Sequence, residues 1–382
     1  MLLAGSAFAL LAWLCVLLAP VRAHRVIEQL EADPAAPDDL GDVAVVIPAR
    51  DEEALIGRAI AALGLQGRGL EVVVVDDQSR DGTRAAAARA ATSSLALRII
   101  DGAPLPDGWA GKLWALEQGL ATVERPHLLL LDADIELAPR TVPALLAHAR
   151  ERGATLVSLM AELHCETFWE RLLAPAFVFF FKLLYPFAWS NDAGKATAAA
   201  AGGCMLVQTA ALRQIGGFAA IRGALIDDCT LAAALKRQRP PIWLGMTRSV
   251  RSLREYATLA DFWRMVSRSA FTQLRRSTAL LLAATVLMLL TLLAPVAGVA
   301  AAAVTGEPRL LLTAAAAWAA LAAAYWPVVS FYRLPATWAA TLPVAAALFL
   351  AMTWGSAVDY WRGKGATWKA RDYGRLPRAT RP

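Results

Sequence analysis

Short apolar runs alternate with segments of helical periodicity between residues 43 and 160. The predicted strands are 43–47, 72–75, 97–100, 128–131 and 154–160, and the predicted helices are 52–64, 83–92, 112–122 and 139–151. Strands made almost only of Val, Ile and Leu are typical of a parallel sheet that is covered on both faces. The pattern therefore predicts an α/β fold with a mostly parallel central sheet.

Much longer apolar segments lie at the two ends of the chain. Residues 1–21 contain no charged side chain, and residues 278–358 contain three. About 20 apolar residues suffice to cross a bilayer, so we expect a transmembrane anchor at 1–21 and a transmembrane region at 278–358. Arg22 and Arg25 follow the first segment rather than precede it, which favours an uncleaved anchor over a signal peptide and places the following residues in the cytoplasm.

The C-terminal region contains three apolar blocks, at 278–304, 310–332 and 336–358. Three crossings would place the tail 359–382 outside, although it carries seven basic and two acidic residues. The positive-inside rule favours a basic cytoplasmic tail instead. The sequence therefore leaves the number of C-terminal crossings open.

The charge of the central region excludes one class of function. Residues 22–277 contain 29 basic and 29 acidic side chains, so the net charge of +6 arises from the C-terminal end. A nucleic-acid-binding domain would carry a basic surface of its own, so we expect no nucleic-acid partner. The four cysteines are scattered without zinc spacing, which indicates buried thiols in a reducing compartment.

Polar clusters follow three of the predicted strands. They read PARDEE at 48–53, DDQSRDGT at 76–83 and DAD at 132–134. Ligands of open α/β sheets bind beyond the carboxyl ends of the strands, so these clusters predict a binding site. The first turn lacks the glycines of a dinucleotide-binding fold. An aspartyl phosphatase is disfavoured because its D-x-D would follow an early strand.

The chemistry of these clusters predicts a site for a nucleotide sugar. Asp132 and Asp134 would hold a hard divalent cation, Mg²⁺ or Mn²⁺, together with phosphate oxygens. Such a cation neutralises charge on a departing diphosphate. Asp76 and Asp77, after the neighbouring strand, are suited to accept hydrogen bonds from a base or a ribose.

Five ordered motifs resemble those of family 2 glycosyltransferases, which have the GT-A fold. They are VVIPARDEE (45–53), VVVVDDQSRDGT (72–83), LLLLDADIE (128–136), GGCMLVQTAALRQIGGF (202–218) and IDD (226–228). The segments PLPDGWAGKLWALEQG (104–119) and WRMVSRSAFTQL (263–274) further resemble the hopanoid-biosynthesis-associated branch.

The resemblance implies how the donor nucleotide is bound. Pro48, Arg50 and Asp77 would frame the base, with Asp77 accepting a hydrogen bond from a uracil N3–H. Asp76 would support that loop or the ribose. Lys112 would lie near the ribose or the phosphates.

The resemblance also implies the catalytic groups. Asp132 would face the ribose and the donor sugar, Asp134 would bind the metal, and Asp228 would act as the general base of an inverting transfer. Asp227 stands where the family often has Glu, and only the family pattern selects Asp228 over it. The stretch 263–268 takes the place of a Q-x-x-R-W motif but has no R-W pair; Arg268, or Arg264 as the alternative, would contact the diphosphate. The altered motif favours transfer of one sugar over polymer synthesis.

The segment 168–189 is unusually aromatic for its place between the metal motif and the base. A spanning helix here would separate Asp132 from Asp228 by the membrane. We therefore expect an amphipathic helix at the interface, with Arg171 and Lys182 snorkelling, that delivers a lipid acceptor. The alternative is a buried helix of the domain.

These observations predict a membrane-bound inverting glycosyltransferase in the inner membrane, multi-pass, with its catalytic domain in the cytoplasm. It would use a nucleotide-sugar donor (a UDP-sugar), a divalent cation and a lipid acceptor, for which a hopanoid is one candidate. The alternatives are transfer to a polyprenyl phosphate and a catalytically silent scaffold. The expected regions are an anchor (1–21), a linker (22–42), a glycosyltransferase domain (43–277), a transmembrane region (278–358) and a tail (359–382).

Overall fold

The computed structural model describes residues 1–92, 95–237, 240–363, 367–368 and 371–372. The chain forms two compact units. We call the first the sheet unit; it contains residues 28–164 and 189–255 and the short strands β9 (Thr367–Trp368) and β10 (Arg371–Asp372). The second, the helical unit, contains residues 1–27, 165–188 and 256–365.

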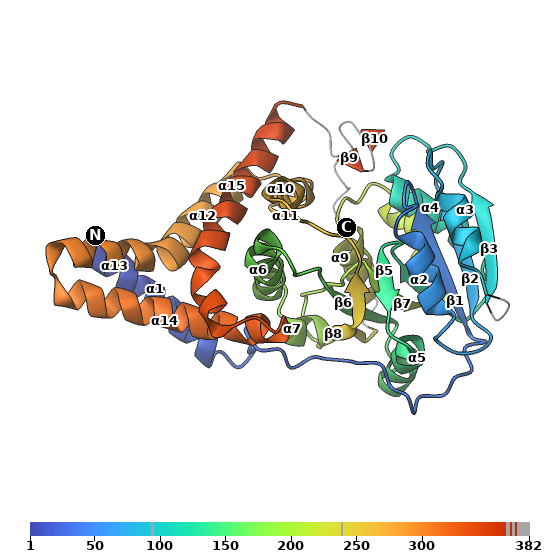
Figure 1. Ribbon diagram of the computed structural model, residues 1–382, viewed down its shortest axis with the longest axis horizontal. Helices are drawn as coiled ribbons and strands as arrows, with labels where there is room; N and C mark the ends of the chain where they lie inside the picture. Colours follow the sequence, from blue (N-terminus) through green and yellow to red (C-terminus); the bar gives the residue numbers. More distant parts are fainter. Residues whose placement is uncertain (93–94, 238–239, 364–366, 369–370, 373–382) are drawn as a thin grey trace. The chain divides into compact units, whose positions relative to one another are not determined.

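The sheet unit is built around eight strands in the order β3-β2-β1-β4-β7-β6-β8-β5 (Figure 1). The strands are β1 (Val43–Ala49), β2 (Glu71–Asp76), β3 (Ala96–Asp101), β4 (His127–Leu131), β5 (Ile135–Leu137), β6 (Leu156–Glu162), β7 (Cys204–Gln208) and β8 (Ile242–Ser252). Strands β1 to β4 are mutually parallel, and β6 is parallel to β8. The predicted α/β fold with a mostly parallel sheet is confirmed.

Three strands of the eight-stranded sheet were not predicted from the sequence. They are β5, β7 and β8, and two of them run against their neighbours: β7 is antiparallel to β4 and β6, and β5 is antiparallel to β8. The helix–strand alternation that indicates parallel pairing gives no signal for strands that return in the opposite direction. The sheet is therefore mixed in its second half.

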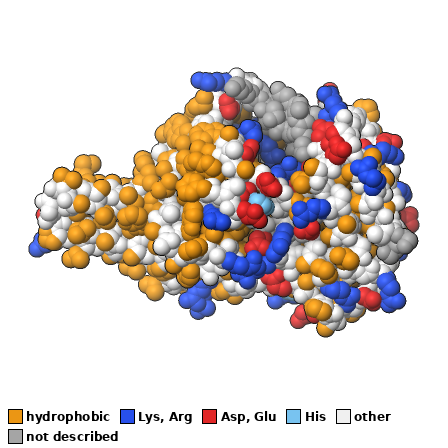
Figure 2. All heavy atoms as spheres, in the orientation of Figure 1, with side chains coloured by type: hydrophobic (Ala, Val, Ile, Leu, Met, Phe, Trp, Pro, Cys, Tyr) orange, Lys and Arg blue, Asp and Glu red, His pale blue; other side chains and the backbone are white. Residues whose placement is uncertain are grey.

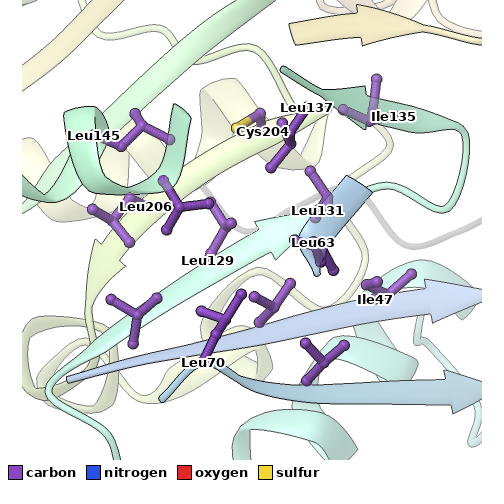
Figure 3. Close-up of a cluster of buried hydrophobic side chains, with 14 of the residues drawn as sticks. Ile47, Leu63, Leu70, Leu129, Leu131, Ile135, Leu137, Leu145, Cys204 and Leu206 are labelled. Atoms are coloured by element: carbon purple, nitrogen blue, oxygen red, sulfur yellow. The ribbon is translucent and has the colours of Figure 1, made fainter. Parts of the chain in front are cut away.

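Both faces of the sheet are covered by helices, which explains its continuous apolar strands. Alternate residues of β1 enter different cores: Val45 and Ile47 lie in one, and Ala44 and Val46 in the other. The first core, partly shown in Figure 3, is covered by α2 (Ile56–Leu63), α3 (Thr83–Arg89) and α5 (Thr141–Arg152). The second is covered by α4 (Gly111–Leu120), α8 (Thr209–Gln214), η1 (Gly217–Ile221) and α9 (Asp227–Lys236).

Helix α4 lies very close to the sheet because Gly119 faces β1. A Cβ atom at Gly119 would lie 2.4 Å from Cγ1 of Val46, which is inside van der Waals contact. This close approach fixes the height of α4 above the strands. It therefore also fixes Lys112, in the first turn of the same helix.

The helical unit contains the apolar segments of both chain ends. They form α1 (Leu2–Leu18), α12 (Thr278–Met288), the π-helical turn η2 (Leu289–Leu293), α13 (Ala294–Thr305), α14 (Pro308–Phe331), η3 (Ala336–Thr341) and α15 (Leu342–Trp361). Among the described residues, three continuous helices are long and apolar enough to cross a membrane: Thr278–Thr305, Pro308–Phe331 and Ala336–Trp361. Helix α1 has only 17 residues. In Figure 2, hydrophobic side chains cover most of the visible surface of this unit, as contact with lipid requires.

The aromatic segment 168–189 belongs to the helical unit up to residue 188. It forms α6 (Phe168–Leu184) and the start of α7 (Phe187–Asn191). Phe179 is fully buried and packs against Trp13 of α1 and Tyr325 of α14, with ring centroids 6.2 and 5.1 Å apart. Lys182 is only 1% exposed, with its ammonium 3.9 Å from the centre of the Phe187 ring, so the expectation that it snorkels is wrong.

The remaining helices of this unit follow β8 in the chain. They are α10 (Leu259–Ser267) and α11 (Ala270–Gln273). Arg268 is the C-cap residue of α10 and therefore lies in the helical unit, outside the sheet unit that contains the other predicted site residues.

Candidate active site

The loops that follow β1 and β2 are tied together by Arg50. Its guanidinium donates hydrogen bonds to the backbone carbonyls of Asp77 and Gln78 and lies 4.0 Å from the Asp77 carboxylate. The backbone N–H of Asp77 donates to the Ala49 carbonyl at 2.8 Å. Arg50 is 5% exposed and Asp77 is fully buried. The two predicted base-binding residues are thus brought together as one rigid element.

Pro48 and Asp76 lie at the ends of the same two strands. Pro48 is buried within β1 and pairs in register with Val75 of β2. The Asp76 carboxylate accepts a hydrogen bond from the backbone N–H of Ser79 at 3.0 Å, so it holds the turn that follows β2. The predicted role of Asp76, toward this loop or toward the ribose, stays a prediction.

A lysine joins the carboxylates that follow β4 to those that begin α9. The ammonium of Lys112 lies 2.8 Å from Oδ1 of Asp132 and 3.2 Å from Oδ2 of Asp227. These side chains come from α4, the loop after β4, and the first turn of α9, which are far apart in the sequence. The structure therefore brings Lys112, Asp132 and Asp227 together at the carboxyl edge of the sheet.

Asp228 is held by backbone donors rather than by the lysine. Its two carboxylate oxygens accept hydrogen bonds from the N–H groups of Gly202 at 3.0 Å and Cys229 at 2.7 Å. A Cβ atom at Gly202 would lie 3.3 Å from the Asp228 carboxylate and 3.4 Å from the Lys112 ammonium. The GG sequence at 202–203 thus brings backbone close to both groups.

Burial and mutual repulsion perturb the ionisation of this cluster. Burial, reinforced by the Asp227 charge, raises the pKa of Asp228 to about 6. Burial also raises the pKa of Asp132 to about 6, against the opposing effect of Lys112. Burial alone would lower the pKa of Lys112, but the charges of Asp132 and Asp227 outweigh it and raise that pKa. Lys112 therefore stays charged.

Asp134 is paired with an arginine that was not predicted from the sequence. Nε of Arg254 lies 2.6 Å from Oδ2 of Asp134, and its Nη2 lies 2.6 Å from Oε1 of Glu52. Arg254 follows β8 by two residues and reaches Asp134 because β8 pairs with β5. The contact between Arg254 and Asp134 could have been predicted only from the pairing of β8 with β5, and that pairing was not predicted.

The donor set at Asp134 fits a metal ion that brings further ligands with it. Within the described ranges, no three His, Cys, Asp or Glu side chains converge as a complete metal site would. Asp134 nevertheless holds a cation, the Arg254 guanidinium, at 2.6 Å from Oδ2. Mg²⁺ is commonly bound through one or two carboxylates plus substrate phosphates. The residues present suit that kind of site.

Comparison with protein families assigns the central part of the chain. Residues 44–216 match the family described as glycosyl transferase family 2. This range includes the loops after β1, β2 and β4 but ends before α9. This part of the chain is therefore similar to family 2 glycosyltransferases.

A solved structure shows the same fold over most of the chain. It is the mannosyltransferase PcManGT from Pyrobaculum calidifontis, in complex with GDP-Man and Mn²⁺. The two chains are 21% identical with a TM-score of 0.53, and the match covers 94% of this chain and 99% of that one. The similarity confirms the predicted GT-A-like fold.

A curated relative is similar over a shorter stretch. The undecaprenyl-phosphate 4-deoxy-4-formamido-L-arabinose transferase of Shewanella sediminis (strain HAW-EB3) is 35% identical over 115 residues. The match covers 28% of this chain and 33% of that transferase, so the chain spans about a third of the relative's length. The resemblance to the hopanoid-associated branch stays a prediction.

Proposed function

We propose that the protein is a membrane-bound inverting glycosyltransferase that moves one sugar from a nucleotide-sugar donor to a lipid acceptor. One observation carries the proposal: Asp228 lies beside the Lys112–Asp132 ion pair at the carboxyl edge of a family 2 domain. A candidate base and a candidate metal motif therefore share one edge of the sheet, in a chain that also contains membrane-length helices.

The donor would bind with its base at the Arg50–Asp77 pair. Asp77 is fully buried, and Arg50 fixes its loop, so the carboxylate is held in position to accept a hydrogen bond from a base N–H. A UDP-sugar is the proposed donor, with Pro48 and Asp76 shaping the pocket wall. The similar mannosyltransferase was solved with GDP-Man, so guanine is the alternative base.

Asp134 would bind Mg²⁺ or Mn²⁺, which supplies charge neutralisation for the departing diphosphate when it is present. Lys112, which stays charged, would add a second positive charge near the phosphates. Asp132 would orient the ribose and the donor sugar, and its ion pair with Lys112 holds it in place. Arg268 is proposed to contact the diphosphate.

Asp228 would take the proton from the acceptor hydroxyl as that oxygen attacks the anomeric carbon. Two backbone N–H groups orient its carboxylate, and a pKa of about 6 leaves it mostly ionised at neutral pH. A base with a pKa close to the working pH is efficient in general-base catalysis. Attack opposite to the leaving diphosphate inverts the anomeric configuration.

The acceptor is proposed to be a lipid that reaches the site from the membrane. The helical unit supplies the membrane segments, and exposed apolar side chains on the aromatic segment, Phe168 (60% exposed) and Leu184 (54%), are suited to contact lipid. A hopanoid hydroxyl is one candidate. The similar transferase from Shewanella sediminis is named for an undecaprenyl-phosphate substrate, which supports a polyprenyl phosphate as the second candidate. The proposed location is the inner membrane, with the catalytic domain in the cytoplasm.

The test is transfer by the purified full-length protein in lipid nanodiscs. UDP- and GDP-sugars would be supplied with Mn²⁺ and with either a hopanoid fraction or a polyprenyl phosphate, and products would be read by mass spectrometry. A mass increase of one sugar that is absent from Asp228→Asn supports the proposal. Nucleotide binding without transfer to any lipid would indicate the silent scaffold instead.

A further inference from the structure

Sheet pairing places Arg254 beside the metal motif. Ile135 of β5 pairs with Ser252 of β8, and the next residue, Leu253, donates its N–H to the Asp134 carbonyl at 2.7 Å. This backbone contact fixes the chain one residue before Arg254. The guanidinium therefore reaches Asp134 because of the strand register and not through a flexible loop.

The guanidinium bridges two carboxylates from different loops. Nε contacts Asp134 and Nη2 contacts Glu52, both at 2.6 Å. The exposed fractions are 31% for the Arg254 side chain, 16% for Asp134 and 10% for Glu52. Glu52 is itself fixed, since its N–H donates to the Thr83 hydroxyl at 2.7 Å. The bridge is partly shielded from water, where charge-assisted contacts are strong.

We propose that Arg254 holds the place of the metal cation in the nucleotide-free site and moves to the donor diphosphate when the metal binds. This inference rests on the proposed metal site at Asp134. A metal ion and a guanidinium cannot contact Oδ2 of Asp134 from the same side at once. Metal binding must therefore displace Arg254 from that oxygen. Arginine matches phosphate oxygens in geometry and charge, and the diphosphate offers the displaced guanidinium a new anion.

The bridge makes metal affinity depend on the nucleotide. Without a nucleotide, the metal must displace the guanidinium from Asp134 while no diphosphate is present to receive it. With a nucleotide, the diphosphate binds the guanidinium, which then no longer competes with the metal for Asp134. Arg254 is therefore a positioning residue whose effect is measured by metal binding and not only by turnover.

The experiment is calorimetric titration of the full-length protein with Mn²⁺ alone, and with Mn²⁺ in the presence of UDP or GDP. Typical couplings between two ligands are about 5–150-fold. We expect Arg254→Gln to bind Mn²⁺ alone at least about fivefold more tightly than wild type, and the enhancement by nucleotide to shrink by a similar factor. Direct metal–phosphate contact contributes to the enhancement in both proteins, so the change in affinity for Mn²⁺ alone is the decisive result. Equal or weaker binding of Mn²⁺ alone by the variant overturns the proposal.

Arg58→Gln is the matched control. Arg58 pairs with Glu136, two residues after Asp134, at 3.1 Å, but its side chain is 61% exposed. Removing this charge changes the local potential without touching Asp134. If Arg58→Gln tightened Mn²⁺ binding as much as Arg254→Gln, general electrostatics would explain the result and the placeholder role would be wrong.

Two further variants keep the test decisive. Glu52→Gln retains the guanidinium but removes its second anchor, so it should shift Mn²⁺ affinity in the same direction by a smaller factor, even if Arg254→Gln fails to fold. Asp134→Asn should abolish Mn²⁺ binding. If wild type and Asp134→Asn bound Mn²⁺ equally, the proposed metal site would fail, and the inference on Arg254 with it. If Asp134→Asn lost Mn²⁺ binding but neither Arg254→Gln nor Glu52→Gln changed it, the metal site would stand and only the inference on Arg254 would be refuted.

Discussion

The two adjacent carboxylates at the start of α9 have different environments. Asp227 forms an ion pair with Lys112, whereas Asp228 accepts hydrogen bonds from two backbone N–H groups. Burial and the Asp227 charge raise the pKa of Asp228 to about 6, so its carboxylate is a better proton acceptor than an ordinary aspartate.

Replacing Asp228 with Asn should slow transfer without weakening donor binding. The side chain keeps its size, but it can no longer take a proton, and general-base catalysis typically contributes about 10²–10⁴-fold. Turnover should fall within that range while calorimetry shows unchanged affinity for the donor nucleotide. If Asp227→Asn were inactive and Asp228→Asn retained normal turnover, the assignment of the base would be reversed.

The activity should depend on pH through the same carboxylate. Because burial and the Asp227 charge raise the pKa of Asp228 to about 6, the base becomes protonated as the pH falls through that value. The rate should be nearly constant above about pH 7 and should fall by about tenfold per unit well below pH 6. A pH profile of kcat with saturating donor and metal checks this. A rate that stays flat down to pH 4.5 would show that no group with this pKa acts as the base.

At the scale of elements, α6 is held by one buried carboxylate. Glu170 is fully buried and completes a capping box with Thr167 at the start of the helix. Its Oε2 accepts from the N–H groups of Glu166 and Thr167, and its Oε1 accepts from the N–H of Tyr256 at 2.8 Å. The same side chain therefore fixes the helix start and the chain that enters α10.

Replacing Glu170 with Ala should destabilise the protein because it leaves several N–H groups without their acceptor. Each unsatisfied buried group costs about 1–3 kcal/mol. Near-UV circular dichroism can follow thermal unfolding of the helical unit, since the rings of Phe179 and Tyr325 are buried there. The transition should move to lower temperature for Glu170→Ala and much less for Glu166→Ala, whose side chain is exposed. Equal shifts would contradict a special role for Glu170.

The sequence predicted the elements whose contacts are local or parallel, and missed those formed by chain reversal. Strands β1 to β4 and β6 follow from apolar runs, and the site residues at their ends follow from the topology of parallel sheets. The contacts of Arg254 and Glu52 depend on the antiparallel pairing of β5 with β8, and β5 has only three residues. The burial of Lys182 depends on how separate segments of the helical unit pack. No local sequence pattern predicts the pairing of β5 with β8 or the burial of Lys182.

At the scale of the molecule, the direction of α15 bears on the number of membrane crossings. In Figure 1, α15 runs steeply across the direction of α13 and α14. From this direction we predict that α15 adds no crossing, although it is long and apolar enough for one. With α1, Thr278–Thr305 and α14 as the crossings, we predict that the basic tail is on the same side of the membrane as the residues that follow α1. This topology satisfies the positive-inside rule.

Reporter fusions would test this topology. Alkaline phosphatase at the C-terminus should be inactive, and a fluorescent protein there should fluoresce, if the tail is cytoplasmic. Phosphatase inserted at Gly306, between α13 and α14, should be active because that turn faces the opposite side. An active phosphatase at the C-terminus would show that α15 crosses the membrane.

The helical unit is assembled from three separate stretches of sequence, so its helices are synthesised at different times. Helix α6 is complete roughly 160 residues before α15 begins, which corresponds to about 8–32 s at about 5–20 residues per second. During that interval, Phe177 and Phe180 lack Phe349, the ring that covers both of them in the folded protein. A ribosome that stalls before α15 would therefore release a chain with an uncovered aromatic helix. Such truncated products should depend on chaperones or the lipid surface to stay out of aggregates.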